Sequence, residues 1–305
     1  MRRRSIGSWL RCGRHVRSQA SLRNMYPESP DAAPESKESP FDPKSFDSPI
    51  VKAVALPLVA ALAILFHLSP LGFLLEGFHV WIHEVGHATV AWLSGRPALP
   101  LPFGWTNVES ERSHIVYMVI LFFLGALAVT GWRERRAWPM FLAVALIAAQ
   151  TFMTWGLSED REHLWMIFGG VGGELYLSAA MISLFFFEFP EKFRWGSCRY
   201  IVLFIGAASF FDSYSFWKKV KSGVEEIPYG SMINGEDDGG GDMNILADQY
   251  HWTQHRIVGT YNHLADACLA SIVIVYLFYN LRLNKAFNPL LSRLLSMGLK
   301  TSDQE

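Results

Sequence analysis

The chain has little cysteine and little charge. Its 305 residues include three cysteines, too few and too widely spaced for a disulfide framework or a thiolate zinc site: Cys12, Cys198 and Cys268. Charged residues make up only 18% of the sequence, and no run of basic residues interleaved with aromatics suggests nucleic-acid binding. We therefore expect no nucleic-acid partner, and we expect any bound metal to have histidine and carboxylate ligands.

Long apolar stretches account for much of the remaining sequence. Hydrophobic residues make up 50% of the chain, and crossing a hydrocarbon core takes about 20 residues. Six windows of suitable length carry either no charge or a single carboxylate: 53–75, 115–132, 137–158, 164–187, 200–217 and 257–281. The pattern predicts an all-α polytopic membrane protein with about six transmembrane helices, surrounded by lipid and located in the cell membrane.

Both ends of the sequence are expected to lie outside the membrane domain. The first 24 residues hold arginines and no acid, which favours a basic cytoplasmic tail or an upstream extension ahead of Met25 over a transit peptide. The following residues are rich in proline, serine and acids, so the whole segment 1–50 is predicted to be a disordered tail. The membrane domain is then expected over 51–281, with a C-terminal tail over 282–305.

The distribution of lysine and arginine predicts the topology. Basic residues in the connections 133–136 and 192–199 and after residue 281 place these segments in the cytoplasm. The connection 157–163 and the long loop 218–256, which has an acidic, glycine-rich turn, then lie outside. With a cytoplasmic N-terminus, the first 40 or so residues of the membrane domain must make one net crossing, so the helix after the first span is re-entrant or half-spanning. If that helix spans fully, the N-terminus lies outside.

The most informative feature is the sequence His83-Glu84-Val85-Gly86-His87 inside an apolar stretch. Two histidines four residues apart lie on one face of a helix, so both imidazoles can reach one Zn²⁺. Glu84 can take a proton from a metal-bound water, the arrangement of HExxH metalloproteases. Such groups are costly in a membrane unless they pair, coordinate a metal or line a wet cavity. We therefore predict His83 and His87 as zinc ligands and Glu84 as the catalytic base, rather than a polar seam between helices.

Other histidines of the chain are not expected to bind the metal. His79 continues the stripe one turn earlier, but three histidines on one straight stripe cannot all reach one tetrahedral ion. We expect His79 to hold other groups of the site in place or to be structural. His251 and His255 form a second pair at this spacing without an adjacent acid, and they favour an interfacial cluster beside the last span.

A zinc site needs a third protein ligand, and several carboxylates compete for this role. Glu174 ranks first, because it stands near the middle of an apolar span after four glycines that permit close helix packing. Its alternative role is that of a protonated or hydrogen-bonded carboxylate in a glycine-lined seam. The other candidates, in order, are Asp238 or Asp242 in the glycine-rich loop, then Asp266, then Asp212.

Each of these aspartates also has a simpler interpretation. Asp238 and Asp242 fit a solvated acidic turn, and Asp242 also fits an N-cap of a short helix over 243–250. Asp266 lies three residues after His263, which predicts a structural pair, and Asp212 can bond locally or carry protons.

Three features of the sequence resemble the intramembrane zinc metalloproteases of the site-2 protease family. They are the HEVGHA motif at 83–88, the Gly-Gly-Glu step at 172–174 and the Asp-Gly-Gly step at 238–240. The resemblance implies His83 and His87 as ligands, Glu84 as base and Asp238 as the third ligand. The chain departs from the family at Glu174, where the family has an asparagine, and it has no recognisable PDZ insertion. It is therefore similar to a divergent or separate group of membrane HExxH proteins.

We expect an enzyme that hydrolyses peptide bonds of membrane-associated or transmembrane proteins with one Zn²⁺ at membrane depth. The segment 99–106 is a candidate for an extended edge that binds the substrate backbone. The main alternative is a non-proteolytic metal-binding protein or a proton or metal-ion transporter, built from the intramembrane acids with His79 and His263. A third possibility is a pseudoenzyme that keeps the fold as a binding partner.

Overall fold

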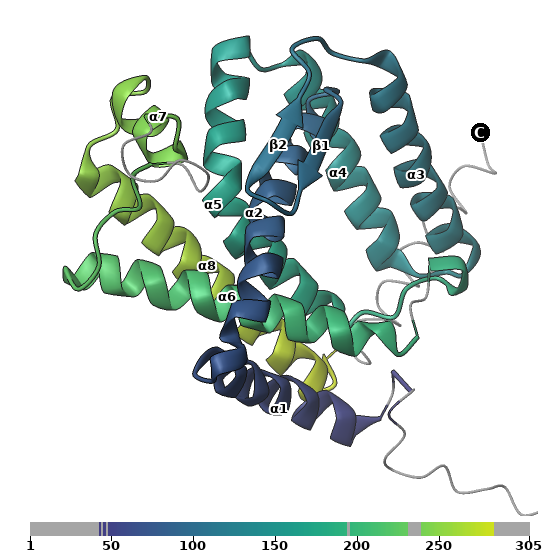
Figure 1. The fold of residues 1–305 in the computed structure, drawn as a ribbon. Coiled ribbons are helices and arrows are strands. Elements are labelled where there is room, and N and C mark those ends of the chain that lie inside the picture. Colours follow the sequence, from purple (N-terminus) through teal and green to yellow (C-terminus); the bar gives the residue numbers. More distant parts are fainter. Residues whose placement is uncertain (1–42, 44, 47, 194–195, 231–238, 284–305) are drawn as a thin grey trace, which may run out of the picture. The chain divides into compact units, whose positions relative to one another are not determined.

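The computed structural model describes residues 43, 45–46, 48–193, 196–230 and 239–283, which lie in the unit Pro40–Glu305. Two short 3-10 helices, Pro70–Gly72 and Glu191–Phe193, and a two-stranded antiparallel sheet accompany the α-helices (Figure 1). The described residues form α1 (Pro49–His67), α2 (Phe73–Leu93), β1 (Ala98–Leu101), β2 (Trp105–Val108), α3 (His114–Arg133), α4 (Ala137–Trp155), α5 (Glu159–Leu184), α6 (Cys198–Ser222), α7 (Asp242–Asp248) and α8 (Gln254–Asn280).

Six of the described helices are long and apolar enough to cross a membrane: α1, α3, α4, α5, α6 and α8. This confirms the predicted all-α polytopic membrane fold. The helix that carries the HEVGH motif, α2, is not one of the six, because histidines and glutamates interrupt its apolar sequence. Whether α2 spans the membrane or enters it only partly stays a prediction, as does the orientation of the loops.

Local sequence signals explain where several helices begin and end. The side chains of Ser48, Ser113 and Thr253 accept hydrogen bonds from the first turns of α1, α3 and α8, so each is an N-cap. Thr253 thus caps the last of the long apolar helices. Helix α2 ends at Leu93, and Gly95, two residues later, adopts the left-handed φ of 77° that is common just after helix ends.

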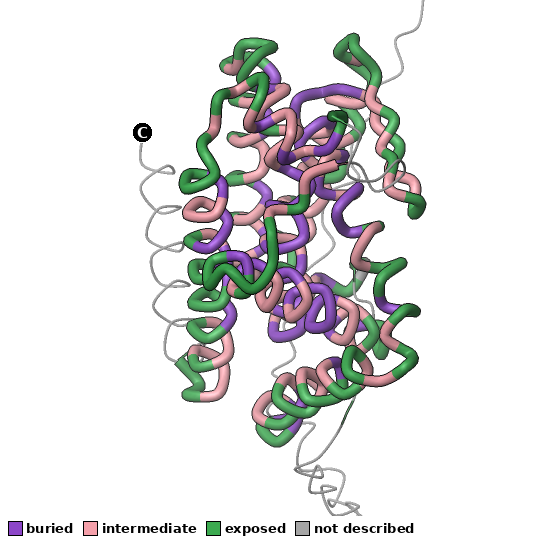
Figure 2. Tube along the Cα trace, turned by 60° about the vertical axis from the view of Figure 1, so that its left-hand side comes forward, coloured by how far each residue is buried: buried purple, intermediate pink, exposed green. Residues whose placement is uncertain are grey.

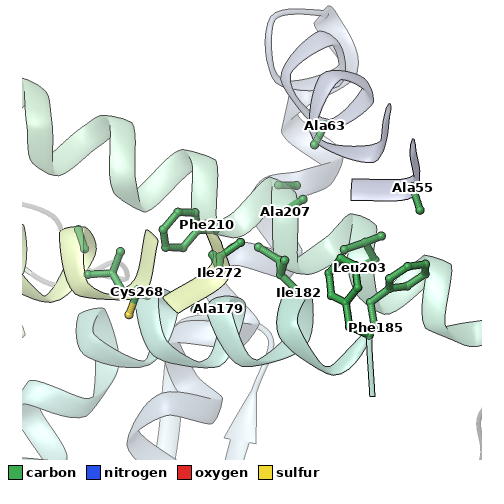
Figure 3. Packing of buried hydrophobic residues seen from close by; sticks show 14 of the residues in the cluster. Ala55, Ala63, Ala179, Ile182, Phe185, Leu203, Ala207, Phe210, Cys268 and Ile272 are labelled. Atoms are coloured by element: carbon green, nitrogen blue, oxygen red, sulfur yellow. The ribbon is translucent and has the colours of Figure 1, made fainter. Parts of the chain in front are cut away.

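Helix α5 lies at the centre of the packing. It contacts α2, α6, α7 and α8, and buried residues concentrate where the helices meet (Figure 2). Side chains of α5, α6 and α8, among them Ile182, Leu203, Phe210 and Ile272, form one apolar cluster with α1 (Figure 3). Lipid is as apolar as leucine, so close packing rather than water exclusion stabilises such contacts in a membrane.

Glycines bring the motif helix α2 directly against α5. A Cβ atom added to Gly86 would lie 2.2 Å from the carbonyl oxygen of Gly169 and 2.9 Å from Cα of Gly173. The two backbones therefore touch, which agrees with the close packing expected from these glycines. Any side chain at Gly86 would separate the two helices that carry the candidate site.

The predicted extended segment 99–106 is a hairpin. Strands β1 and β2 pair with Leu99 opposite Asn107 and Pro100 opposite Thr106, and Gly104 takes a left-handed φ of 81° in the turn. The base of the hairpin is anchored to α5: Arg96 and Arg112 both pair with the fully buried carboxylate of Glu162. Because a buried carboxylate needs such partners, this cluster sets the position of the hairpin relative to α5.

Candidate metal centre

Three side chains converge on one point between α2, α5 and α7. The Nε2 atoms of His83 and His87 are 3.1 Å apart, and Oδ2 of Asp242 lies 3.3 and 3.4 Å from them. Two ligands of a tetrahedral zinc ion are about 3.3 Å apart when each bond is about 2.0–2.1 Å long. Among the described residues, these three form the one group whose histidine and acid ligand atoms lie close enough together to hold a metal ion.

The hydrogen bonds around the histidines leave their Nε2 atoms as electron-pair donors. Nδ1 of His87 donates to the carbonyl oxygen of Met166 at 2.7 Å, and Nδ1 of His83 donates to Oε1 of Glu174 at the same distance. A neutral imidazole then has its lone pair at Nε2. Oδ2 of Asp242 is buried and accepts no hydrogen bond. A cation placed between them would satisfy three lone-pair atoms that face one another in this way.

Gly170 leaves a space between the three ligand atoms in which a cation would fit. A Cβ atom added at Gly170 would lie 2.5 Å from Nε2 of His87, 2.6 Å from Nε2 of His83 and 2.5 Å from Oδ2 of Asp242. This point is nearly equidistant from all three ligand atoms, at little more than a zinc–ligand bond length. The missing side chain is therefore what allows the point to hold an ion.

Glu174 contacts Nδ1 of His83, on the other side of the ring from the ligand atom Nε2. Its Oε1 accepts from Nδ1 of His83, and its Oε2 accepts from Ser213 at 2.6 Å and lies 3.3 Å from Nε2 of His79. The expectation that Glu174 is the third ligand is therefore revised in favour of Asp242, since an oxygen bound to Nδ1 cannot also reach the point between the Nε2 atoms. His79, which also bonds Ser209 at 3.2 Å, has the supporting position expected for it.

The remaining acidic candidates lie away from this point or outside the described residues. Asp266 pairs with Lys218 at 2.7 Å and contacts Tyr214, rather than pairing with His263 as predicted. Asp212 pairs with His67 at 2.8 Å. Asp238, the ligand implied by the family resemblance, lies outside the described residues. His251 and His255 are both exposed and do not belong to the candidate metal group.

Packing of a short helix explains why Asp242 reaches the histidines. Asp242 is the first residue of α7 rather than its N-cap, which is Gly241. The buried Met243 and Leu246 insert into a cluster with Trp217 and Tyr261 from α6 and α8. This anchoring directs the N-terminus of α7 toward α2 and α5.

A second contact holds the segment after α7 to the start of α5. His163 and the hydroxyl of Tyr250 are 2.7 Å apart, and this hydroxyl donates to the carbonyl oxygen of Asp160. Burial, and then the charge of Asp160, raise the pKa of Tyr250, so the hydroxyl stays protonated and able to donate. The third ligand therefore depends on tertiary contacts on both sides of α7.

Glu84 follows His83 in α2 and does not belong to the group of three ligand atoms. It is 3% exposed, and its Oε2 accepts a hydrogen bond of 2.5 Å from the hydroxyl of Thr106 on β2. Both residues line a cavity of about 1150 Å³ together with His83, His87 and Asp242. Residues 104–110 of the hairpin line this cavity, whereas β1 does not. The cavity therefore extends from the three ligand residues along β2.

Sequence reasoning missed four contributors to this geometry. Thr106 and Ser213 carry no motif, and the carbonyl oxygen of Met166 has no side-chain signal at all. Gly170 was noticed only as a packing glycine. Gly170 stands four residues before Glu174, and this spacing places both residues on the same face of α5.

A pair of substitutions distinguishes a ligand from a supporting residue. We expect Glu174→Gln to lower zinc affinity by about 10–100-fold, because His83 loses its charged hydrogen-bond acceptor. Asp242→Asn should lower affinity further, because it weakens a ligand. Competition with a chromophoric chelator on detergent-purified protein measures both, and Asp266→Asn serves as a matched control. A greater loss from Glu174→Gln than from Asp242→Asn would contradict the assignment.

The arrangement meets the chemical requirements of a catalytic metal centre. Three protein ligands leave a fourth tetrahedral position for water or substrate, unlike closed structural zinc sites. The buried Glu84 lines the same cavity as the three ligand residues, and the volume of about 1150 Å³ is large enough for a polypeptide segment. The chain matches no family model, no curated protein and no solved structure, so the chemistry of these residues alone carries the interpretation.

Proposed function

We propose that the protein is an integral membrane zinc metallopeptidase. The observation that carries the proposal is the convergence of His83, His87 and Asp242 on the point beside Gly170, with Glu84 adjacent. Zn²⁺ bound there would polarise a scissile carbonyl and lower the pKa of a water molecule. The role of the protein is to hold these groups in place around a cavity that admits a peptide.

Glu84 acts as general base and then as general acid. Its carboxylate takes a proton from the attacking water and returns it to the nitrogen of the leaving amine. The low exposure of Glu84 keeps bulk water away from this proton transfer. Glu84 stands between the proposed ligands His83 and His87 in the sequence, so one turn of α2 carries both the base and two of the metal ligands.

The substrate is a membrane-associated or transmembrane protein that presents an extended segment. Strand β2 lines the cavity, and its other edge pairs with β1, so a peptide can add to the free edge through main-chain hydrogen bonds. Such binding places the peptide backbone beside Thr106 and Glu84. The location in a cell membrane, with several crossings, is part of the same proposal.

An ion or proton transporter is the second candidate function. Two pairs of polar groups outside the three ligands favour this function. His79 lies 3.3 Å from Glu174, and His67, the last residue of α1, pairs with Asp212. Ionisable groups inside a membrane often mark ion pathways. A transporter, however, has no use for a base placed beside the metal ligands.

Metal removal tests the proposed enzyme. The purified protein in detergent should contain one zinc per chain by atomic emission and should cleave fluorescein-labelled casein. A zinc chelator should abolish cleavage, and added zinc should restore it. Zinc-loaded protein that cleaves neither casein nor a panel of transmembrane substrates would leave the transporter as the better interpretation.

A further inference from the structure

A hydrogen bond joins Thr106 of the hairpin to Glu84, the proposed base, and neither residue is a metal ligand. The hydroxyl of Thr106 lies 2.5 Å from Oε2 of Glu84 and 3.0 Å from the carbonyl oxygen of the same residue. A hydroxyl has a single hydrogen, and its short bond to a carboxylate is charge-assisted and stronger than one to a carbonyl. The contact therefore fixes the rotamer of the Glu84 side chain.

The position of Thr106 is itself determined by the helix that builds the metal site. Arg96, before β1, and Arg112, after β2, both bind Glu162 of α5. The same helix carries Gly170 and the carbonyl oxygen of Met166, to which His87 donates. Helix α5 thus places the ligands directly and places the base through the hairpin.

We propose that Thr106 is a positioning residue for Glu84, and that the strand which binds the peptide also orients the base. The proposal rests on the proposed peptidase function. With Oε2 held by the hydroxyl of Thr106, Oε1 is the oxygen that takes the proton of the attacking water. A peptide added to β2 lies on the strand that holds this hydroxyl, so productive binding and a correctly oriented base occur together.

Three variants of Thr106 separate the hydroxyl from the shape of the side chain. Thr106→Val removes the hydroxyl and keeps the branched shape that suits a strand, and Thr106→Ser keeps the hydroxyl. Thr106→Ala removes the hydroxyl without adding a methyl group in its place, so it replaces the valine variant if that variant does not fold. Thr89→Val is a matched control, because Thr89 lies on α2, the helix of Glu84, and its hydroxyl donates to the carbonyl oxygen of Val85 at 2.7 Å instead of to Glu84.

The first measurement is hydrolysis of labelled casein by the zinc-loaded variants. We expect kcat to fall about 10–100-fold in Thr106→Val with KM and zinc content unchanged, because one charge-assisted hydrogen bond to the base is lost. Thr106→Ser should keep most of the activity. A loss of zinc, a change confined to KM, or equal losses in the serine and valine variants would overturn the proposal.

The second measurement does not require turnover. In the cobalt-substituted protein, acetohydroxamate binding is followed by the visible absorption of the metal, and a hydroxamate held there would form a hydrogen bond with the carboxylate of Glu84. Thr106→Val should weaken this binding about tenfold relative to wild type, Thr106→Ser and Thr89→Val, because the carboxylate is no longer held in place. Equal affinities in all four proteins would overturn the proposal even if no cleavable substrate is known. A protein without hydrolysis that still shows the tenfold difference would count against the peptidase function and not against the role of Thr106.

Discussion

Replacement of Gly170 by alanine is expected to abolish zinc binding while the helices stay folded. The added Cβ would stand 2.5–2.6 Å from both Nε2 atoms and from Oδ2 of Asp242. A zinc ion needs the same place, at about 2.0–2.1 Å from each of these atoms. Because carbon and metal cannot share the point, we expect the affinity to fall by about a thousandfold or more.

A neighbouring glycine provides the control for this substitution. The three atoms nearest to a Cβ added at Gly172, on the same helix, all belong to the ring of Phe168 and lie 3.0–3.4 Å away. The ring can move by the few tenths of an ångström required, so Gly172→Ala should keep full zinc content. Zinc per chain, measured by atomic emission after gel filtration, compares the two variants. Stoichiometric zinc of wild-type affinity in Gly170→Ala would show that the metal is held elsewhere.

Local sequence was sufficient to predict the helices. The uncharged windows 115–132 and 137–158 correspond to α3 and α4, whereas the window 53–75 includes most of α1 but runs past its end at His67 into the start of α2. The cap at Thr253 depends on a side chain that acts within a few residues, and the stop after α2 depends on the left-handed backbone of Gly95. The hairpin was seen only as an extended segment, because the pairing of Pro100 with Thr106 depends on a turn at Gly104.

Part of the candidate site could also be predicted from local sequence, and part could not. His83, Glu84 and His87 share one helical turn, so their common placement follows from spacing alone. The third ligand comes from α7, and its place depends on tertiary packing of Met243 and Leu246 that spacing does not reveal. Depth in the membrane favoured Glu174 instead, but the sequence does not say which nitrogen of His83 a carboxylate meets.

Replacement of Glu84 by glutamine is expected to abolish peptide hydrolysis while zinc stays bound. Glutamine has nearly the same shape, and its amide oxygen can still accept the hydrogen bond from Thr106. It has no basic oxygen, so the water proton has no acceptor, and the rate should fall by about 10²–10⁴-fold. The ligand atoms of His83, His87 and Asp242 are unchanged, so the zinc content should equal that of the wild-type protein.

Glu76→Gln is the matched control, because Glu76 is an exposed carboxylate on the same helix, and its variant should cleave labelled casein at the wild-type rate. The comparison also separates the two candidate functions. Transport of a metal ion or a proton depends on groups that bind and release the ion, so a transporter should tolerate Glu84→Gln better than a loss of His83 or His87. A peptidase should be inactivated by either change, with zinc retained only in Glu84→Gln. Full hydrolysis by zinc-loaded Glu84→Gln would remove the base from the mechanism, and with it the reason for a carboxylate buried between the metal ligands and Thr106.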